Sequence, residues 1–180
     1  MLRSSFRWIA HPYVPRADRC KQALLGVAVV VATGCGGSHV ASKPIAGRGY
    51  SFETPANWTV VRTQRTVQVS RGVKLVSVTR FPLLRAYRPE LWPKVVVEID
   101  RSAAALAAGQ KGSVSSRTTL TIAGLRARRY DIAYARGGKQ LTERVGFVLH
   151  GKTEYELLCR FERGKDSTAC DLLFRSFRLT

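Results

Sequence analysis

The sequence predicts an α+β domain in which a central antiparallel sheet is covered by one long helix and a C-terminal helix. Many short segments alternate between β-branched or aromatic residues and polar residues, as strands do. One interior stretch, residues 91–108, instead repeats its apolar residues at helical spacing. A second helical stretch, residues 168–177, closes the chain. Strands therefore outnumber helices, and two helices remain to cover the sheet.

The first half of the domain predicts four short strands. Residues 49–55 alternate aromatic and polar side chains and stop at Pro55, and residues 57–61 and 67–70 continue the strand pattern. Residues 73–81 are rich in β-branched side chains, which predicts a buried strand that Pro82 closes.

The long helix is predicted from about residue 91 to residue 108. Pro93 suits a first helical turn and would break a helix interior, while Gly109 and Gly112 mark the end. One face of this helix is apolar and should pack on the sheet; it consists of Leu91, Val95, Ile99, Ala103 and Leu106.

The second half predicts an antiparallel meander over residues 118–122, 126–134, 141–149 and 154–162. The segment Arg136-Gly137-Gly138-Lys139 is a strong hairpin signal between two of these strands. In the last strand Tyr155, Leu157, Cys159 and Phe161 share the inward face. Its other face, with Glu154, Glu156 and Arg160, is interpreted as solvated and ion-paired.

Cys159 and Cys170 are predicted to form a disulfide. Residues 168–171 resemble a capping box, which places Cys170 in the first turn of the last helix, facing the sheet. Cys159 lies on the inward face of the preceding strand, so both side chains point into one layer. An even pair of cysteines in an exported protein favours a disulfide. Two buried free thiols are the alternative.

The N-terminal segment, residues 1–34, has the three-part pattern of a signal peptide. A basic stretch precedes a ten-residue apolar run at 23–32, which is too short to span a hydrocarbon core of about 30 Å. The segment Ala32-Thr33-Gly34-Cys35 then resembles a bacterial lipobox. The resemblance implies cleavage before Cys35, a diacylglyceryl group on its thiol and acylation such as palmitate. An ordinary cleavage site with an unmodified Cys35 is the alternative.

The lipobox resemblance implies a lipid-anchored protein on the extracytoplasmic face of the cell membrane. Gly, Ser and Pro follow Cys35, so residues 35–46 are predicted to be a flexible tether and residues 47–180 a single domain.

The chain is strongly basic, with a formal net charge of +18. Residues 1–34 hold five of the 30 basic and one of the 12 acidic side chains, so the remainder keeps about +14. Such a charge favours anionic membrane surfaces or polymers, although arginine-rich composition or a merely solvated face also explains it. Nucleic acid is not expected as a partner of an exported domain. The candidate residues for binding an anionic surface are Arg80, Arg85, Arg88, Arg126, Arg128, Arg129, Arg136 and Lys139.

No catalytic constellation stands out, and we predict no enzyme activity, metal or cofactor. The chain has no Gly-x-Ser-x-Gly, and His150, the one histidine in the predicted domain, is interpreted as a solvated residue beside a turn. The leading hypothesis is a non-catalytic interaction module of the cell envelope that binds an envelope protein or an anionic polymer. A small-ligand carrier with a pocket between the long helix and the sheet is the alternative, and an unrecognised enzyme ranks third.

The domain resembles small lipoproteins of the PsbP/Mog type. The similar features are an opening Phe-x-x-Pro-x-x-Trp pattern at Phe52, Pro55 and Trp58, and a glycine–aromatic strand with Gly124 and Tyr130. The resemblance implies an α/β/α sandwich around a central antiparallel sheet and a role in assembly or protein binding. A cystatin-like or NTF2-like fold is the alternative, because both also lay a helix on a curved antiparallel sheet.

Overall fold

The computed structural model describes residues 41–180, and within that range the predicted α+β class is confirmed. A seven-stranded antiparallel sheet has the strand order β3-β4-β5-β9-β8-β7-β6. Its strands are β3 (Thr59–Arg62), β4 (Thr66–Arg71), β5 (Lys74–Pro82), β6 (Ser113–Ile122), β7 (Leu125–Arg136), β8 (Lys139–His150) and β9 (Thr153–Glu162). The predicted leader and Cys35 lie outside the described residues.

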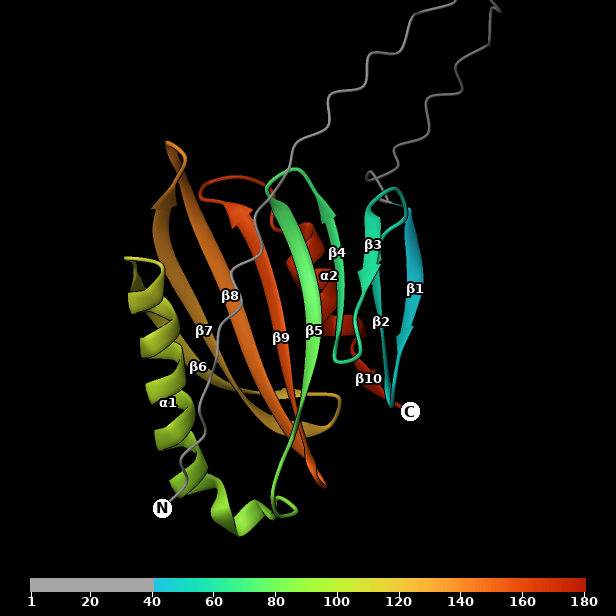
Figure 1. Cartoon of the computed structure of the whole chain (residues 1–180), viewed down its shortest axis with the longest axis vertical. Helices are drawn as coiled ribbons and strands as arrows, with labels where there is room; N and C mark the ends of the chain where they lie inside the picture. Colours follow the sequence, from blue (N-terminus) through green and yellow to red (C-terminus); the bar gives the residue numbers. More distant parts are fainter. Residues whose placement is uncertain (1–40) are drawn as a thin grey trace, which may run out of the picture. The chain divides into compact units, whose positions relative to one another are not determined.

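A smaller sheet of β1 (Ser42–Gly47), β2 (Tyr50–Pro55) and β10 (Arg178–Leu179) lies beside the main sheet (Figure 1). The prediction of a tether as far as residue 46 was wrong. Residues 42–47 pair antiparallel with β2, and Ile45 is buried. The ordered domain therefore begins before residue 47.

Helix α1 (Trp92–Gly109) follows a short 3₁₀ turn, Pro89–Leu91, and matches the predicted long helix. Pro93 occupies its first turn, as expected. The helix lies along β6 and β7 on one face of the main sheet (Figure 1). Its buried side chains Ile99, Ala103 and Leu106 pack against Tyr130 and Ile132. The centre of this interface is apolar.

Helix α2 (Thr168–Ser176) matches the predicted C-terminal helix and covers the opposite face together with the small sheet. Leu173 and Phe177 are fully buried there with Tyr50 and Phe52. The cap differs from the prediction, because the N-cap is Ser167 and Asp166 Oδ1 accepts a hydrogen bond from the Thr168 amide. Hydrogen bonds from the hydroxyl and amide of Thr168, with Lys74 nearby, lower the pKa of Asp166 to about 2.

The strand turns follow the sequence signals. Gly137 and Gly138 both have positive φ between β7 and β8, as a tight two-residue hairpin turn requires. None of the helices among residues 41–180 is both long enough and apolar enough to cross a membrane.

Candidate functional site

The eight predicted surface-binding residues do not form one surface. Arg128 and Arg129 are adjacent in β7, so their side chains leave opposite faces of the sheet. Arg128 contacts Asp100 of α1, whereas Arg129 faces α2. Arg136 lies at the far end of the same strand, about 35 Å from Arg126, and pairs with Lys139 at the start of β8. The prediction that five of these residues cluster on one hairpin was therefore wrong; the five are Arg126, Arg128, Arg129, Arg136 and Lys139.

Arg128 belongs to a polar network that attaches α1 to the sheet. Its Nε lies 3.3 Å from Asp100 Oδ1, and the Tyr130 hydroxyl donates to the same carboxylate oxygen. Burial opposes ionisation of Asp100, but the hydrogen bonds from Tyr130 and Arg128 outweigh it and lower the pKa of this carboxyl. Arg128 therefore has a structural partner and is not free to bind a ligand.

Three other predicted residues lie near the start of α1. The Arg126 guanidinium carbon is 4.8 Å from the centre of the Trp92 ring, which favours a cation–π contact. Arg85 and Arg88 are exposed in the connection between β5 and α1. Arg80 lies on the other face of the sheet, over the Tyr155 ring.

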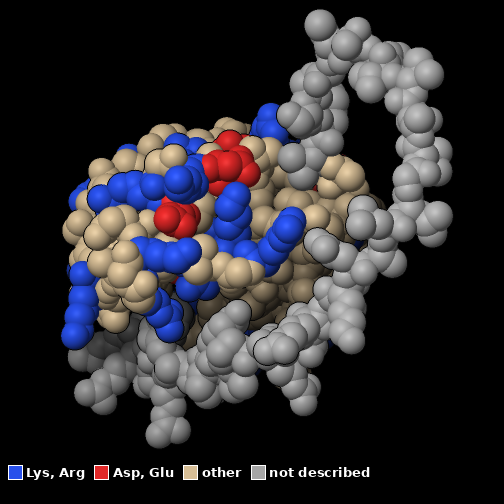
Figure 2. All heavy atoms as spheres, turned by 90° about the horizontal axis from the view of Figure 1, so that it is seen from above, with Lys and Arg blue, Asp and Glu red and all other residues tan. Residues whose placement is uncertain are grey.

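Arg136 and Lys139 belong to a different basic surface that the sequence did not reveal as a unit. We call it the basic end; it consists of the β4–β5 turn, the β7–β8 turn and the β9–α2 loop. Among the charged side chains on the face of the domain seen in Figure 2, which looks onto this end, lysine and arginine predominate over aspartate and glutamate. The basic side chains of these turns are Arg71, Lys74, Arg136, Lys139, Arg163 and Lys165.

Strand pairing brings the three turns of the basic end together. Gln140 accepts a hydrogen bond from the Arg163 amide, and Lys74 Nζ lies 3.1 Å from Asp166 Oδ2. Lys139 Nζ lies 3.4 Å from Glu162 Oε2. The two lysines are thereby neutralised. The exposed side chains of the basic end without an ion pair among the described residues are Arg71, Arg136, Arg163 and Lys165.

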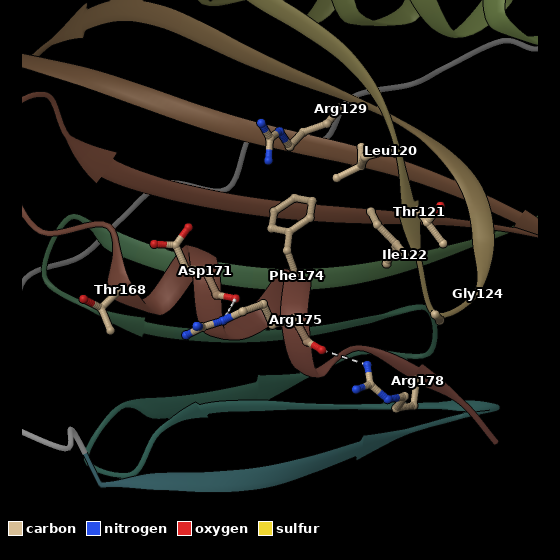
Figure 3. Close-up of a pocket in the computed structure, with 11 residues that line it drawn as sticks. Leu120, Thr121, Ile122, Gly124, Arg129, Thr168, Asp171, Phe174, Arg175 and Arg178 are labelled. Carbon is tan, nitrogen blue, oxygen red and sulfur yellow. Dashed lines mark hydrogen bonds between the residues drawn. The ribbon is translucent and has the colours of Figure 1, made fainter.

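A pocket of about 740 Å³ lies between the β6–β7 hairpin and α2 (Figure 3). The predicted pocket was placed between the long helix and the sheet, whereas this pocket lies beside α2. Leu120, Ile122 and Phe174 form an apolar wall, and Arg129 reaches in from β7. The remaining lining residues are Thr121, Ala123, Gly124, Thr168, Asp171, Arg175 and Arg178.

The charges around this pocket are unbalanced. Its only carboxylate is that of Asp171, which Arg144 Nη1 contacts at 3.2 Å. Arg175 and Arg178 donate to backbone carbonyls only, and Arg129 has no hydrogen bond or ion pair within residues 41–180. Three guanidinium groups thus line one pocket without a carboxylate partner among residues 41–180, and this favours an anionic ligand.

A glycine sets the position of the aromatic wall. A Cβ at position 146 of β8 would lie 2.5 Å from Phe174 Cε1, so a larger residue there would displace the Phe174 ring. The sequence signals for the pocket were weak, because Arg129 and Phe174 are 45 positions apart and neither belongs to a motif.

The acidic residues of β9 differ from the prediction of a solvated, ion-paired face. Register places Arg160 opposite Glu143 of β8, and Arg160 Nε lies 3.7 Å from Glu143 Oε1. Glu154 and Glu156 have no ion pair within the described range. Burial, with Glu154 and Glu143 nearby, raises the pKa of Glu156 to about 7. Burial also raises the pKa of Glu154.

Glu143 is almost fully buried and is held by neutral donors as well as by Arg160. The Tyr134 hydroxyl donates to Glu143 Oε1 at 2.9 Å, and Gln110 donates to Oε2. These contacts attach the end of α1 to β7 and β8. They satisfy the buried Glu143 carboxylate, so its burial needs no catalytic role to explain it.

The described residues bring together no group of three metal-binding side chains, and His150 is exposed at the end of β8. The pocket lining contains neither histidine nor cysteine, so a nucleophile with a neighbouring base is missing from it.

The predicted disulfide is present. Cys159 of β9 and Cys170 of α2 are bonded, with 5.5 Å between their Cα atoms. The bond ties the helix that forms one wall of the pocket to the centre of the main sheet.

No protein-family model matches the sequence, and no curated protein is significantly similar to it. Similarity is found among solved structures. Cyanobacterial PsbP (CyanoP) from Synechocystis sp. PCC 6803 superposes with a TM-score of 0.57 at 14% identity, over 82% of this chain and 98% of that one. The domain has a PsbP-like fold. Among the predicted folds, which were PsbP-like, cystatin-like or NTF2-like, the PsbP-like fold is thus supported.

A protein from Bacteroides thetaiotaomicron VPI-5482 is also similar to the PsbP-like domain, with a TM-score of 0.51 at 10% identity. The similarity covers 73% of this chain but only 45% of the Bacteroides protein. LpqN of Mycobacterium tuberculosis, described as involved in cell envelope biogenesis, has a TM-score of 0.42 at 12% identity over 79% of this chain and 92% of its own, and nothing is concluded from it. Identities this low establish a shared fold and leave function to the site.

Proposed function

We propose that this chain is an exported, lipid-anchored and non-catalytic binding module of the cell envelope. The observation that carries the binding role is the pocket beside α2, whose three guanidinium groups have no carboxylate partner. The lipobox-like segment at Cys35 supports the anchor, and the Cys159–Cys170 disulfide is typical of an exported protein. An anionic group of an envelope protein or polymer is the binding partner that this charge favours.

Replacing Cys35 by serine tests the anchor. We expect the wild-type chain to partition into a detergent phase with an added diacylglyceryl mass, because two acyl chains hold a protein stably on a membrane. The Cys35→Ser variant should lose the added mass and this partitioning. The matched control is Cys20→Ser, which lies in the predicted leader and should behave as the wild type does. An unmodified wild-type Cys35 in the mass spectrum contradicts the proposal.

A small-ligand carrier is a second candidate, and the volume of the pocket favours it. About 740 Å³ falls within the range of ~300–1,000 Å³ that is usual for small-molecule sites. Arginine beside an apolar wall suits a ligand with one anionic group and an apolar portion. This site differs from the predicted carrier pocket, because it uses α2 and not α1.

Octyl phosphate is a suitable probe for the pocket, with octanol as its neutral counterpart. We expect titration calorimetry to show octyl phosphate binding that Arg129→Gln weakens at least tenfold, because a charge-assisted pair is lost. The matched control is Arg85→Gln, which removes an exposed, unpartnered arginine outside the pocket and should change affinity less than twofold. Equal affinities for octanol and octyl phosphate in the wild type contradict an anion site.

A further inference from the structure

The basic end is also the end at which the chain enters the domain. The Ala41 carbonyl accepts a hydrogen bond from the Ala56 amide at 2.8 Å, at the start of β1. Thr59, three residues further on, pairs with Ser70, which is next to the β4–β5 turn. Figure 1 shows the start of β1 at the same end as the β4–β5 and β7–β8 turns, while the C-terminus lies at the opposite end.

Chain length limits how far this end can be from Cys35. Ala41 is six positions after Cys35, and a fully extended chain spans at most ~3.6 Å per residue, or roughly 20 Å in total. A 12-residue strand such as β8 is about 40 Å long, so the opposite end of the domain lies much farther from the anchor. An anchor at Cys35 thus keeps the basic end close to the headgroups.

The charge of the basic end complements an anionic headgroup surface. Glu162 and Asp166 are neutralised by Lys139 and Lys74, and four exposed basic side chains remain without ion pairs. Basic side chains near an anionic leaflet each strengthen binding by roughly fivefold at low ionic strength. No exposed carboxylate in the three turns is left unpaired to oppose this attraction.

We infer that the basic end is the membrane-facing surface of the domain and binds anionic phospholipid headgroups beside the anchor. This inference rests on the proposed anchor for its orientation, whereas its charge complementarity stands on the described residues alone. If the basic end faces the membrane, the β6–β7 turn, which borders the pocket, is directed away from the membrane. This turn lies at the other end of β7.

Vesicle binding of the full chain carrying Cys35→Ser tests the charge without the anchor. We expect tighter binding to phosphatidylcholine vesicles containing 30% phosphatidylglycerol than to pure phosphatidylcholine, by at least tenfold, with the difference removed at 1 M salt. The leader contributes equally to every variant compared. Glutamine at Arg71, Arg136, Arg163 and Lys165 should reduce the preference for anionic vesicles at least tenfold, to the part that the leader contributes.

The opposite end supplies a matched control of three arginines and one lysine, all exposed. Glutamine at Arg48, Arg85, Arg88 and Lys152 removes the same charge from the β1–β2 turn, the β5–α1 connection and the β8–β9 turn. In this control, the logarithm of the affinity ratio between anionic and neutral vesicles should keep at least half of its original value. If it loses as much as the basic-end variant, total charge and not the basic end explains binding, and the inference is overturned.

Orientation is tested in the lipidated wild-type chain by the acetylation rates of lysines. In anionic vesicles Lys165 should react at least fivefold more slowly than in neutral vesicles, while Lys152 should react at the same rate in both. Equal rates for Lys165 in the two vesicles overturn the inference. If the wild-type chain is not lipidated, the proposed anchor is refuted. The vesicle experiment with Cys35→Ser then still decides whether the basic end binds anionic lipid.

Discussion

Removal of the disulfide by replacing Cys159 and Cys170 together with alanine is expected to lower the free energy of unfolding by about 3 kcal/mol. The bond closes a loop between residues 11 positions apart, which corresponds to roughly 3 kcal/mol in the chain-entropy model. Both side chains are buried, so loss of sulfur packing adds to the effect. Thermal unfolding should shift downward by roughly 6–12 °C for a domain of this size.

The reduced wild-type protein is the control for this variant. It should unfold at nearly the same temperature as the double-alanine variant, and mass measurement should show two more hydrogens than in the oxidised form. Two free thiols in the protein purified without reductant contradict the bond. Because α2 forms one wall of the pocket, octyl phosphate affinity should fall together with stability in the reduced protein.

The second large effect is expected from Leu173→Ala in α2, at about 2–5 kcal/mol of lost stability. Leu173 is fully buried, and it packs in the core shared by α2, the small sheet and the main sheet. Truncation of Leu173 leaves a cavity, and α2 cannot easily move to fill it because the disulfide holds the helix. Urea unfolding of both proteins at the same pH measures the difference.

The same substitution at Leu84 is the matched control. Leu84 is 85% exposed in the β5–α1 connection, so Leu84→Ala should change the free energy of unfolding by less than ~0.5 kcal/mol. Similar losses from both substitutions contradict the placement of Leu173 in the core.

Segments with strong periodicity were predicted well. The helical spacing over residues 91–108 and the strand alternation in residues 126–162 both reflect one apolar face meeting one core, which is a local property. The small sheet was only partly predicted. Residues 42–47 contain glycine and proline and bury a single apolar side chain, Ile45, so their extended conformation depends on pairing with β2.

The candidate site was harder to predict than the fold. Five of the eight basic residues, those between positions 126 and 139, were grouped on one hairpin by their closeness along the chain, but side chains in a strand alternate between faces. Arg128 therefore meets Asp100, and Arg129 enters the pocket with Arg175 and Arg178. The basic end gathers Arg71, Arg136 and Arg163 from three turns that are distant in sequence.

The α+β class, the two helices, the main strands and the cysteine pair followed from the sequence by itself, because apolar period and side-chain size act locally. The PsbP-like fold was implied by a resemblance. The Cys35 anchor also comes from sequence alone, and it stays a prediction. Only the tertiary structure decided which charges are free. Asp100, Glu162 and Asp166 neutralise some basic residues, while the guanidinium of Arg129 remains without a partner. Ion pairing depends on distances between segments that only the folded chain brings together.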